Sequence, residues 1–268
     1  MLLILFLSRR KIVKKILLIF LLLLCACTSN KISENIENNA DSHGIIIPAY
    51  IYPNDSIYNK LIESSSKLHE NLIVILNPNN GPDHSDGYAY NKYLEYISLI
   101  QVNNSKIAGY VSTYYGGRSV DEVKSDIDIW ISDYSIDYIF LDETSAQASD
   151  YNYYAELETY IQNKGKKTIN NFGITLNTEY KGLESIKIIL EESAINVNSL
   201  INSVDYQNWT NDESTYNSNA VLIHTANSNY IETIDDYKAY WIYITDDVLE
   251  NPWDSLPSYY EEFINKSI

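Results

Sequence analysis

The sequence predicts a single (β/α)8 barrel of the TIM type, and three observations carry that prediction. Eight short β-rich runs alternate with stretches of helical spacing from residue 44 onward. No Gly- or Pro-rich linker and no shift of composition divides this array. Acidic residues directly follow several of the apolar runs, as they do where a parallel barrel exposes its catalytic face. Eight continuous units favour a closed barrel over a doubly wound sheet.

The predicted strands are short runs rich in aliphatic, β-branched and aromatic residues. In chain order they span residues 44–50, 72–76, 106–111, 138–141, 167–170, 185–190, 220–225 and 240–245.

Helical spacing is clearest between the third and fourth of these strands, over residues 119–133. Val123, Ile127 and Trp130 fall on one face of such a helix, and charged residues occupy the opposite face. Ser119 followed three residues later by Glu122 predicts a capping box at its start.

Residues 193–219 are the weakest part of the pattern, because they are polar and show no clear period. We interpret them as a long loop after the sixth strand. A loop in that position lies over the active site of a barrel.

The first residues of the chain predict an export signal. Five basic residues precede the apolar stretch 16–24, which is short for a membrane span. The sequence Leu24-Cys25-Ala26-Cys27 resembles a bacterial lipobox, so we expect Cys27 to carry lipid. An ordinary cleaved signal peptide and an uncleaved signal anchor remain as alternatives.

These features predict three parts of the chain. Residues 1–26 would be a lipoprotein signal peptide, residues 27–42 a flexible polar tether, and residues 43–268 the barrel. We expect an exported, membrane-anchored lipoprotein, periplasmic or at the cell surface, whose barrel is a monomer. Both cysteines lie at the amino-terminal signal, so the barrel would contain no disulfide.

The charge balance restricts the partners of the exported part. Five of the 19 basic residues lie within residues 1–27, which hold no acid, so 14 basic residues face 36 acidic ones and the formal charge is −22. Nucleic acids and anionic lipid surfaces would be repelled. Neutral or cationic ligands fit this charge better.

Three pairs of acids directly follow predicted strands: Asp142-Glu143, Glu191-Glu192 and Asp246-Asp247. The carboxyl ends of barrel strands meet on one face, so these carboxylates are candidates for a common site. Two carboxylates are the minimal equipment for glycoside cleavage, where one protonates the leaving oxygen and the other attacks the anomeric carbon or activates water.

Other side chains at the same strand ends would form a polar pocket with aromatic edges. A tyrosine ring can stack on the apolar face of a sugar while its hydroxyl reaches a polar group. The candidates for substrate binding are Tyr50, Asn77, Asn79, Tyr110, Tyr114 with its neighbour Tyr115, Asn171 or the adjacent Asn170, His224 and Asp246.

Other chemistries have little support in the sequence. The four histidines show no metal-ligand spacing, so we expect no metal site and no cofactor. The chain contains no G-x-S-x-G elbow, P-loop or dinucleotide fingerprint, which weakens esterase, ATPase and dehydrogenase interpretations.

Five ordered motifs resemble the spherulin 4-like proteins, also called spherulation-specific family 4. They are GIIIPAYIYP at 44–53, ILNPNNGP at 75–82, GYVSTYYG at 109–116, IFLDETS at 139–145 and YITDD at 243–247. Two positions depart from the family pattern: Phe172 stands where the family has Pro, and Asp83 where Gly is usual.

The resemblance implies a (β/α)8 glycoside hydrolase. Characterised relatives in glycoside hydrolase family 135 cleave α-1,4-linked N-acetylgalactosamine in galactosaminogalactan-type polymers. Their functional acids follow the fourth and sixth strands, at the positions that Asp142, Glu143 and Glu191 occupy here.

By analogy with α-acting barrel glycosidases, Asp142 would be the nucleophile and Glu191 the acid/base, with Glu143 as an orienting neighbour. Glu143 could exchange roles with Asp142, and either stereochemical outcome remains open. The first expectation is therefore an endo-acting glycosidase with a polysaccharide substrate. A noncatalytic surface lectin or adhesin on the same barrel is the alternative, and a two-lobed solute-binding lipoprotein ranks last.

Overall fold

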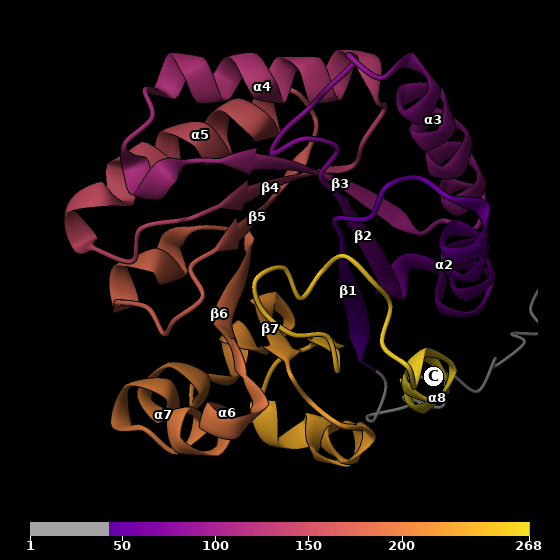
Figure 1. Ribbon diagram of the computed structural model, residues 1–268. Helices are drawn as coiled ribbons and strands as arrows, with labels where there is room; N and C mark the ends of the chain where they lie inside the picture. Colours follow the sequence, from indigo (N-terminus) through magenta and orange to yellow (C-terminus); the bar gives the residue numbers. More distant parts are fainter. Residues whose placement is uncertain (1–42, 268) are drawn as a thin grey trace, which may run out of the picture. The chain divides into compact units, whose positions relative to one another are not determined.

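The computed structural model describes residues 43–267, which belong to one compact unit of the chain. Its eight strands are all parallel and close into a barrel in the order β1 to β8, with β1 paired to β8. Figure 1 shows the strands in a ring with the helices outside it. The predicted single (β/α)8 barrel is confirmed.

The observed strands agree closely with the predicted runs. They are β1 Gly44–Ala49, β2 Leu72–Leu76, β3 Lys106–Ser112, β4 Tyr138–Asp142, β5 Lys167–Asn171, β6 Ile186–Ser193, β7 Asn219–His224 and β8 Trp241–Ile244. Most of their residues are buried, as expected for parallel strands covered on both faces.

The helices are α2 Asp55–Leu68, α3 Gly87–Gln101, α4 Val120–Asp133, α5 Tyr151–Asn163, α6 Ala194–Ile201, α7 Val204–Thr210 and α8 Tyr260–Lys266. Short 3₁₀ segments span His69–Asn71, Tyr114–Gly116, Ala148–Asp150, Thr178–Gly182, Glu213–Ser218 and Ser228–Tyr237. Within residues 43–267, no helix combines the length and the apolar character that crossing a bilayer requires.

Helix α4 shows how the sequence fixes one βα unit. The predicted capping box is present between Ser119 and Glu122, and the predicted apolar face is buried. Trp130 packs on β3 so closely that a Cβ on Gly109 would lie 2.3 Å from its ring, so only glycine fits there. The Trp130 indole donates a hydrogen bond of 2.8 Å to the carbonyl of Tyr110.

The prediction of a long loop over residues 193–219 is wrong. This segment forms α6, α7 and a 3₁₀ turn. Helix α6 buries Ala194, Val197 and Ile201 at helical spacing, while the apolar residues Ile195 and Leu200 are exposed. Ser203 caps α7, which buries Trp209. Each helix spans only about two turns, and the exposed apolar residues of α6 obscure its buried face, so the sequence does not reveal a period.

The predicted signal peptide over residues 1–26, the lipid anchor Cys27 and the tether over residues 27–42 lie outside the described residues. They remain predictions.

Candidate active site

The carboxyl ends of β4, β5 and β6 bring two acids onto one amide group. The side-chain nitrogen of Asn171, Nδ2, lies 2.7 Å from Asp142 Oδ1 and 2.6 Å from Glu191 Oε2. The distance between Asp142 Oδ1 and Glu191 Oε2 therefore cannot exceed the sum of these two hydrogen-bond lengths. Asp142 and Glu191 open into one cavity of about 430 Å³.

Strand register explains why Asp142 and Asn171 are neighbours. Leu141 of β4 pairs with Asn170 of β5, so the next residue of each strand points to the opposite face, which is the barrel interior at its carboxyl end. Asn170 is fully buried and donates instead to Ser185, at 2.8 Å. Of the two adjacent asparagines, only Asn171 lines the cavity with the acids.

An irregularity in β6 aims Glu191 into the same cavity. Ile188 pairs with Ala220 and Leu190 with Val221, so Ile189 is an extra residue without a partner in β7. One extra residue reverses the alternation of side chains beyond it. Without this bulge, Leu190 would point inward and Glu191 would point toward the helices.

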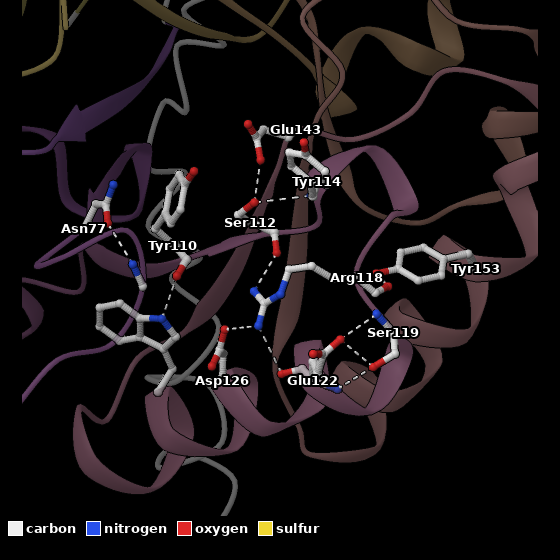
Figure 2. Close-up of polar contacts among 12 residues, drawn as sticks. Asn77, Tyr110, Ser112, Tyr114, Arg118, Ser119, Glu122, Asp126, Glu143 and Tyr153 are labelled. Atoms are coloured by element: carbon white, nitrogen blue, oxygen red, sulfur yellow. Dashed lines mark hydrogen bonds and ion pairs between the residues drawn. The ribbon is translucent and has the colours of Figure 1, made fainter.

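The backbone of Glu143 is held in the left-handed region, with φ of 51°, which is unusual for a residue with a long side chain. Its carbonyl accepts hydrogen bonds from the Tyr115 amide, at 2.7 Å, and from the Thr113 hydroxyl, at 2.8 Å. Its carboxylate accepts a bond of 2.5 Å from the Ser112 hydroxyl (Figure 2). The loop after β3 thus fixes the position of this acid.

Arg118 ties that loop to α4, as Figure 2 shows. Its guanidinium donates to the carbonyl of Ser112, at 2.8 Å, and pairs with Asp126, also at 2.8 Å. The Tyr153 hydroxyl donates to the carbonyl of Arg118. A strained backbone conformation persists only where surrounding contacts maintain it. The contacts of the loop after β3 with Glu143, and of Arg118 with α4, meet this requirement for Glu143.

The electrostatics of the two central acids differ from those of acids in water. Burial and the neighbouring charge of Asp142 raise the pKa of Glu191 to about 7, against the partial relief of hydrogen bonds from Asn171 and Trp253. Burial also raises the pKa of Asp142, although Tyr110 and Asn171 hydrogen bond to it. No lysine or arginine is among the causes of either shift. Near neutral pH this pair can hold one proton and one charge.

Two tyrosines, Tyr50 and Tyr110, lie near the acids, although neither is among the residues that line the cavity. The rings of Tyr50 and Tyr110 meet edge to face at 5.5 Å. Burial, and then the charge of Asp142, raises the pKa of both phenols, so both keep their protons and can donate hydrogen bonds. The hydroxyl of Tyr110 offsets part of the rise in the pKa of Asp142.

The rim of the cavity is more exposed and more apolar than its floor. Tyr115 is 64% exposed and Leu249 is 69% exposed, and both line the cavity. The full lining consists of Tyr115, Asp142, Glu143, Asn171, Phe172, Gly173, Ile174, Glu191, His224 and Leu249. Burial lowers the pKa of His224, so its imidazole is neutral near pH 7.

The remaining predicted site residues lie away from this cavity. Asn77 accepts a hydrogen bond from the Gly81 amide, Asn79 donates to Asp83, and Asp246 accepts from the Ser258 amide. Tyr114 is exposed beside Tyr115 but does not line the cavity. Their predicted contact with substrate remains a prediction.

Trp253 is a site residue that the sequence did not reveal. It lies in the segment after β8, and its carbonyl accepts a bond from the Tyr50 amide. Its ring meets His224 edge to face, at 6.2 Å. Its side chain lies close enough to Glu191 to offset part of the rise in the pKa of that acid. The available signal was a tryptophan in a polar, Pro-containing segment beyond the last strand, which is weak without the fold.

A larger cavity, of about 650 Å³, lies at the opposite end of the barrel. It is lined by the first residues of several strands, including Tyr138, Lys167 and Trp241. Barrel enzymes place their chemistry at the carboxyl ends of the strands, so the smaller cavity with the acid pair is the candidate active site. Among residues 43–267, no cluster of three or more His, Cys, Asp or Glu side chains is arranged to hold a metal.

Comparison with known proteins identifies the family. The family model described as spherulation-specific family 4 matches residues 44–266. Spherulin-4 of Physarum polycephalum is 32% identical over 171 residues, or 62% of this chain. The match covers 48% of that protein, so the chain corresponds to about half the length of this relative.

Two solved structures show the same fold. The crystal structure of Aspergillus clavatus Sph3 in complex with GalNAc has a TM-score of 0.69 and 20% identity, over 85% of this chain and 98% of that one. Active domain 2 of a Pyrococcus furiosus chitinase has a TM-score of 0.50 and 12% identity, over 84% and 95%. On the family match, this chain is a member of spherulation-specific family 4.

Proposed function

We propose that this protein is a glycoside hydrolase that cleaves within a polysaccharide containing α-1,4-linked N-acetylgalactosamine or galactosamine. The observation that carries the proposal is the pair Asp142 and Glu191, held by one amide in an open cavity without a compensating cation. Two carboxylates that differ in protonation are what glycoside cleavage requires.

Glu191 supplies the proton in this proposal. With its pKa raised to about 7, it still carries a proton near neutral pH and can give it to the leaving oxygen. Asp142 provides the negative charge that attacks the anomeric carbon or stabilises the positive charge developing there. The amide-bonded oxygens are close enough for the roughly 5–5.5 Å spacing of retaining enzymes, which favours a covalent intermediate on Asp142.

Glu143 assists from the side. Its carboxylate is tied to Ser112 and its backbone to the loop after β3, so it is placed to orient a sugar hydroxyl or to tune Asp142. Of the adjacent acids Asp142 and Glu143, only Asp142 is hydrogen bonded to Asn171 and so lies next to Glu191. We therefore assign the nucleophilic role to Asp142.

The substrate class rests on the rim and on the fold neighbour. Exposed Tyr115 can stack on a sugar ring, and the open cavity can admit the interior of a chain. Aspergillus clavatus Sph3 was crystallised with GalNAc, which makes this sugar the first candidate. A partly deacetylated aminosugar polymer would be cationic and would be attracted to the acidic domain.

Export and lipid attachment at Cys27 belong to the same proposal. A hydrolase anchored by residues 27–42 outside the cytoplasm would meet a polymer too large to enter the cell. The support is the sequence pattern of residues 1–27 alone.

The experiment is to incubate a soluble domain beginning at Ser42 with a panel of α- and β-linked hexosamine polymers and to identify products by mass spectrometry. The proposal predicts internal cleavage and short oligosaccharides from the α-1,4-linked galactosamine polymers. Binding of these polymers with no release of oligosaccharide would instead support a noncatalytic carbohydrate-binding protein.

A further inference from the structure

Asn171 lies between the two acids, and its single amide nitrogen donates a hydrogen bond to each of them. Nδ2 carries two hydrogens, and one points to Asp142 at 2.7 Å and the other to Glu191 at 2.6 Å. The side chain is 9% exposed, so water competes little for these bonds. Its whole donor capacity is spent on the acid pair.

The orientation of the amide follows from the charge of its neighbours. The other end of the group, Oδ1, is buried and has no hydrogen-bond partner among the described residues. Turning the amide around would place this oxygen against two carboxylates, of which at least one is charged. The nitrogen therefore faces the acids, at the expense of an unpartnered carbonyl.

If the amide did not separate them, the two carboxyl groups could approach each other and share one proton in a direct hydrogen bond. The amide prevents this, because it occupies Asp142 Oδ1 and Glu191 Oε2, the oxygens that face each other across it. A proton on Glu191 must then reside on Oε1. An acid whose proton is shared with its neighbour is a poor donor to a sugar oxygen.

We propose that Asn171 is a positioning residue that keeps the proton of Glu191 from being shared with Asp142 and so keeps the two acids in separate roles. This inference rests on the proposed hydrolase function. It concerns the division of labour between the acids and involves no contact of Asn171 with substrate.

The test compares Asn171→Leu and Asn171→Ala with the matched variant Asn170→Leu. Asn170 is the neighbouring buried asparagine on β5, and it bonds to Ser185, away from the acids. Leucine keeps the volume and removes the donors, whereas alanine lets the two carboxyl groups approach each other. Both Asn171 variants should lose kcat by roughly 10²-fold, as displaced catalytic groups do, with KM little changed.

The decisive readout is the pH profile. Losing a hydrogen bond to a charged carboxylate raises its pKa by about one unit. The alkaline limb of the kcat profile, which follows Glu191, should move to higher pH in both Asn171 variants and stay in place in Asn170→Leu. The inference is wrong if the alkaline limb of the kcat profile has the same midpoint in all three variants and activity falls only in proportion to thermal stability. Asn171 would then contribute to packing alone.

A second readout does not need activity. The pH dependence of thermal unfolding between pH 4 and pH 9 reports the same carboxyl groups. The Asn171 variants should lose stability over a range that extends to higher pH than in the wild-type protein, whereas the curve of Asn170→Leu should run parallel to wild type. If the wild-type protein cleaves no polymer, the proposed function fails, while an unshifted stability curve in the Asn171 variants would still contradict the inference by itself.

Discussion

The two ends of the barrel each bury carboxylates, but they compensate them differently. At the amino end, burial raises the pKa of Glu158, and a hydrogen bond from the Glu184 amide and the positive charge of Lys187 offset part of this rise. Lys187 is almost fully buried and donates to the carbonyls of Leu183 and Ser185. At the carboxyl end, Asp142 and Glu191 share hydrogen-bond donors but have no cation among the causes of their pKa shifts.

The two ends of the barrel therefore differ in whether a nearby cation compensates the buried acid. The charge of Lys187 and the Glu184 amide offset part of the desolvation of Glu158, whereas no cation offsets the desolvation of Asp142 and Glu191. Two acids without a cation cost stability, because at least one must be charged in a buried position. Acids with raised pKa values cluster at functional sites, and the proposed catalytic roles of Asp142 and Glu191 agree with this pattern.

The largest expected effect is on catalysis. Replacing Glu191 by Gln or Asp142 by Asn should lower polymer cleavage by roughly 10²–10⁴-fold or more, because each removes a proton-transfer or charge-bearing group. The reducing ends released per minute measure this loss. Glu158→Gln, at the other end of the barrel, should keep near wild-type turnover. If all three variants lost polymer cleavage equally, the acids at the carboxyl end would have no special role in the reaction.

The next effect is a pH-dependent loss of stability caused by Glu191. In the folded protein its pKa is about 7, compared with the ordinary value of 4.5, so between these values the folded state holds a proton that the unfolded chain has lost. The contribution of Glu191 to stability is therefore fully present below about pH 4.5 and decreases by roughly 1.4 kcal/mol per pH unit up to about pH 7.

Chemical denaturation at several pH values measures this slope. Glu191→Gln should remove it, so the variant becomes the more stable protein as the pH rises toward 7. A wild-type curve that runs parallel to that of Glu191→Gln across this range would show that Glu191 titrates normally.

The amino end should respond in the opposite direction. Glu158→Gln leaves Lys187 without the charge that raises its pKa, and burial already lowers that pKa to about 8. We expect a loss of about 1–3 kcal/mol in the free energy of unfolding near pH 7, the cost of an uncompensated buried polar group. Urea unfolding measures it. A Glu158→Gln protein as stable as wild type would mean that Lys187 does not stabilise the charge of Glu158, so that the two ends of the barrel do not differ.

The smallest effect concerns the rim. Tyr115→Ala should raise KM by about 2–10-fold with little change in kcat, the range expected for the loss of one aromatic contact. Tyr88 is similarly exposed, at 62%, and does not line the cavity, so Tyr88→Ala is the matched control and should leave KM unchanged. A change of kcat alone in Tyr115→Ala would argue against a binding role and for disturbance of the Glu143 backbone that Tyr115 holds.

The barrel was predictable because each strand is a short apolar run with polar residues at its end. Strand periodicity and the spacing of Val123, Ile127 and Trp130 are local properties, which a sequence displays directly. Helices α6 and α7 were missed because each is only about two turns long, and because exposed Ile195 and Leu200 obscure the buried face of α6.

The contacts of the candidate site were harder to anticipate. Strict alternation along β6 would have turned Glu191 away from the cavity. Its place directly after an apolar run made it a candidate, and the resemblance to the family then supported that choice. The bulge at Ile189 depends on pairing with β7, which lies far along the chain. Trp253 reaches Glu191 only because the segment after β8 returns across the barrel end.

The central claim is that Asp142 and Glu191 form an uncompensated pair in which Glu191 keeps its proton near neutral pH. Titration of ¹³C-labelled glutamate carboxyl groups by NMR, with Glu191→Gln to assign the signal, tests it most directly. We predict a midpoint for Glu191 near pH 7 that falls when Asp142 becomes Asn, because the charge of Asp142 is one cause of the shift. A midpoint near 4.5, unchanged in Asp142→Asn, would contradict the claim.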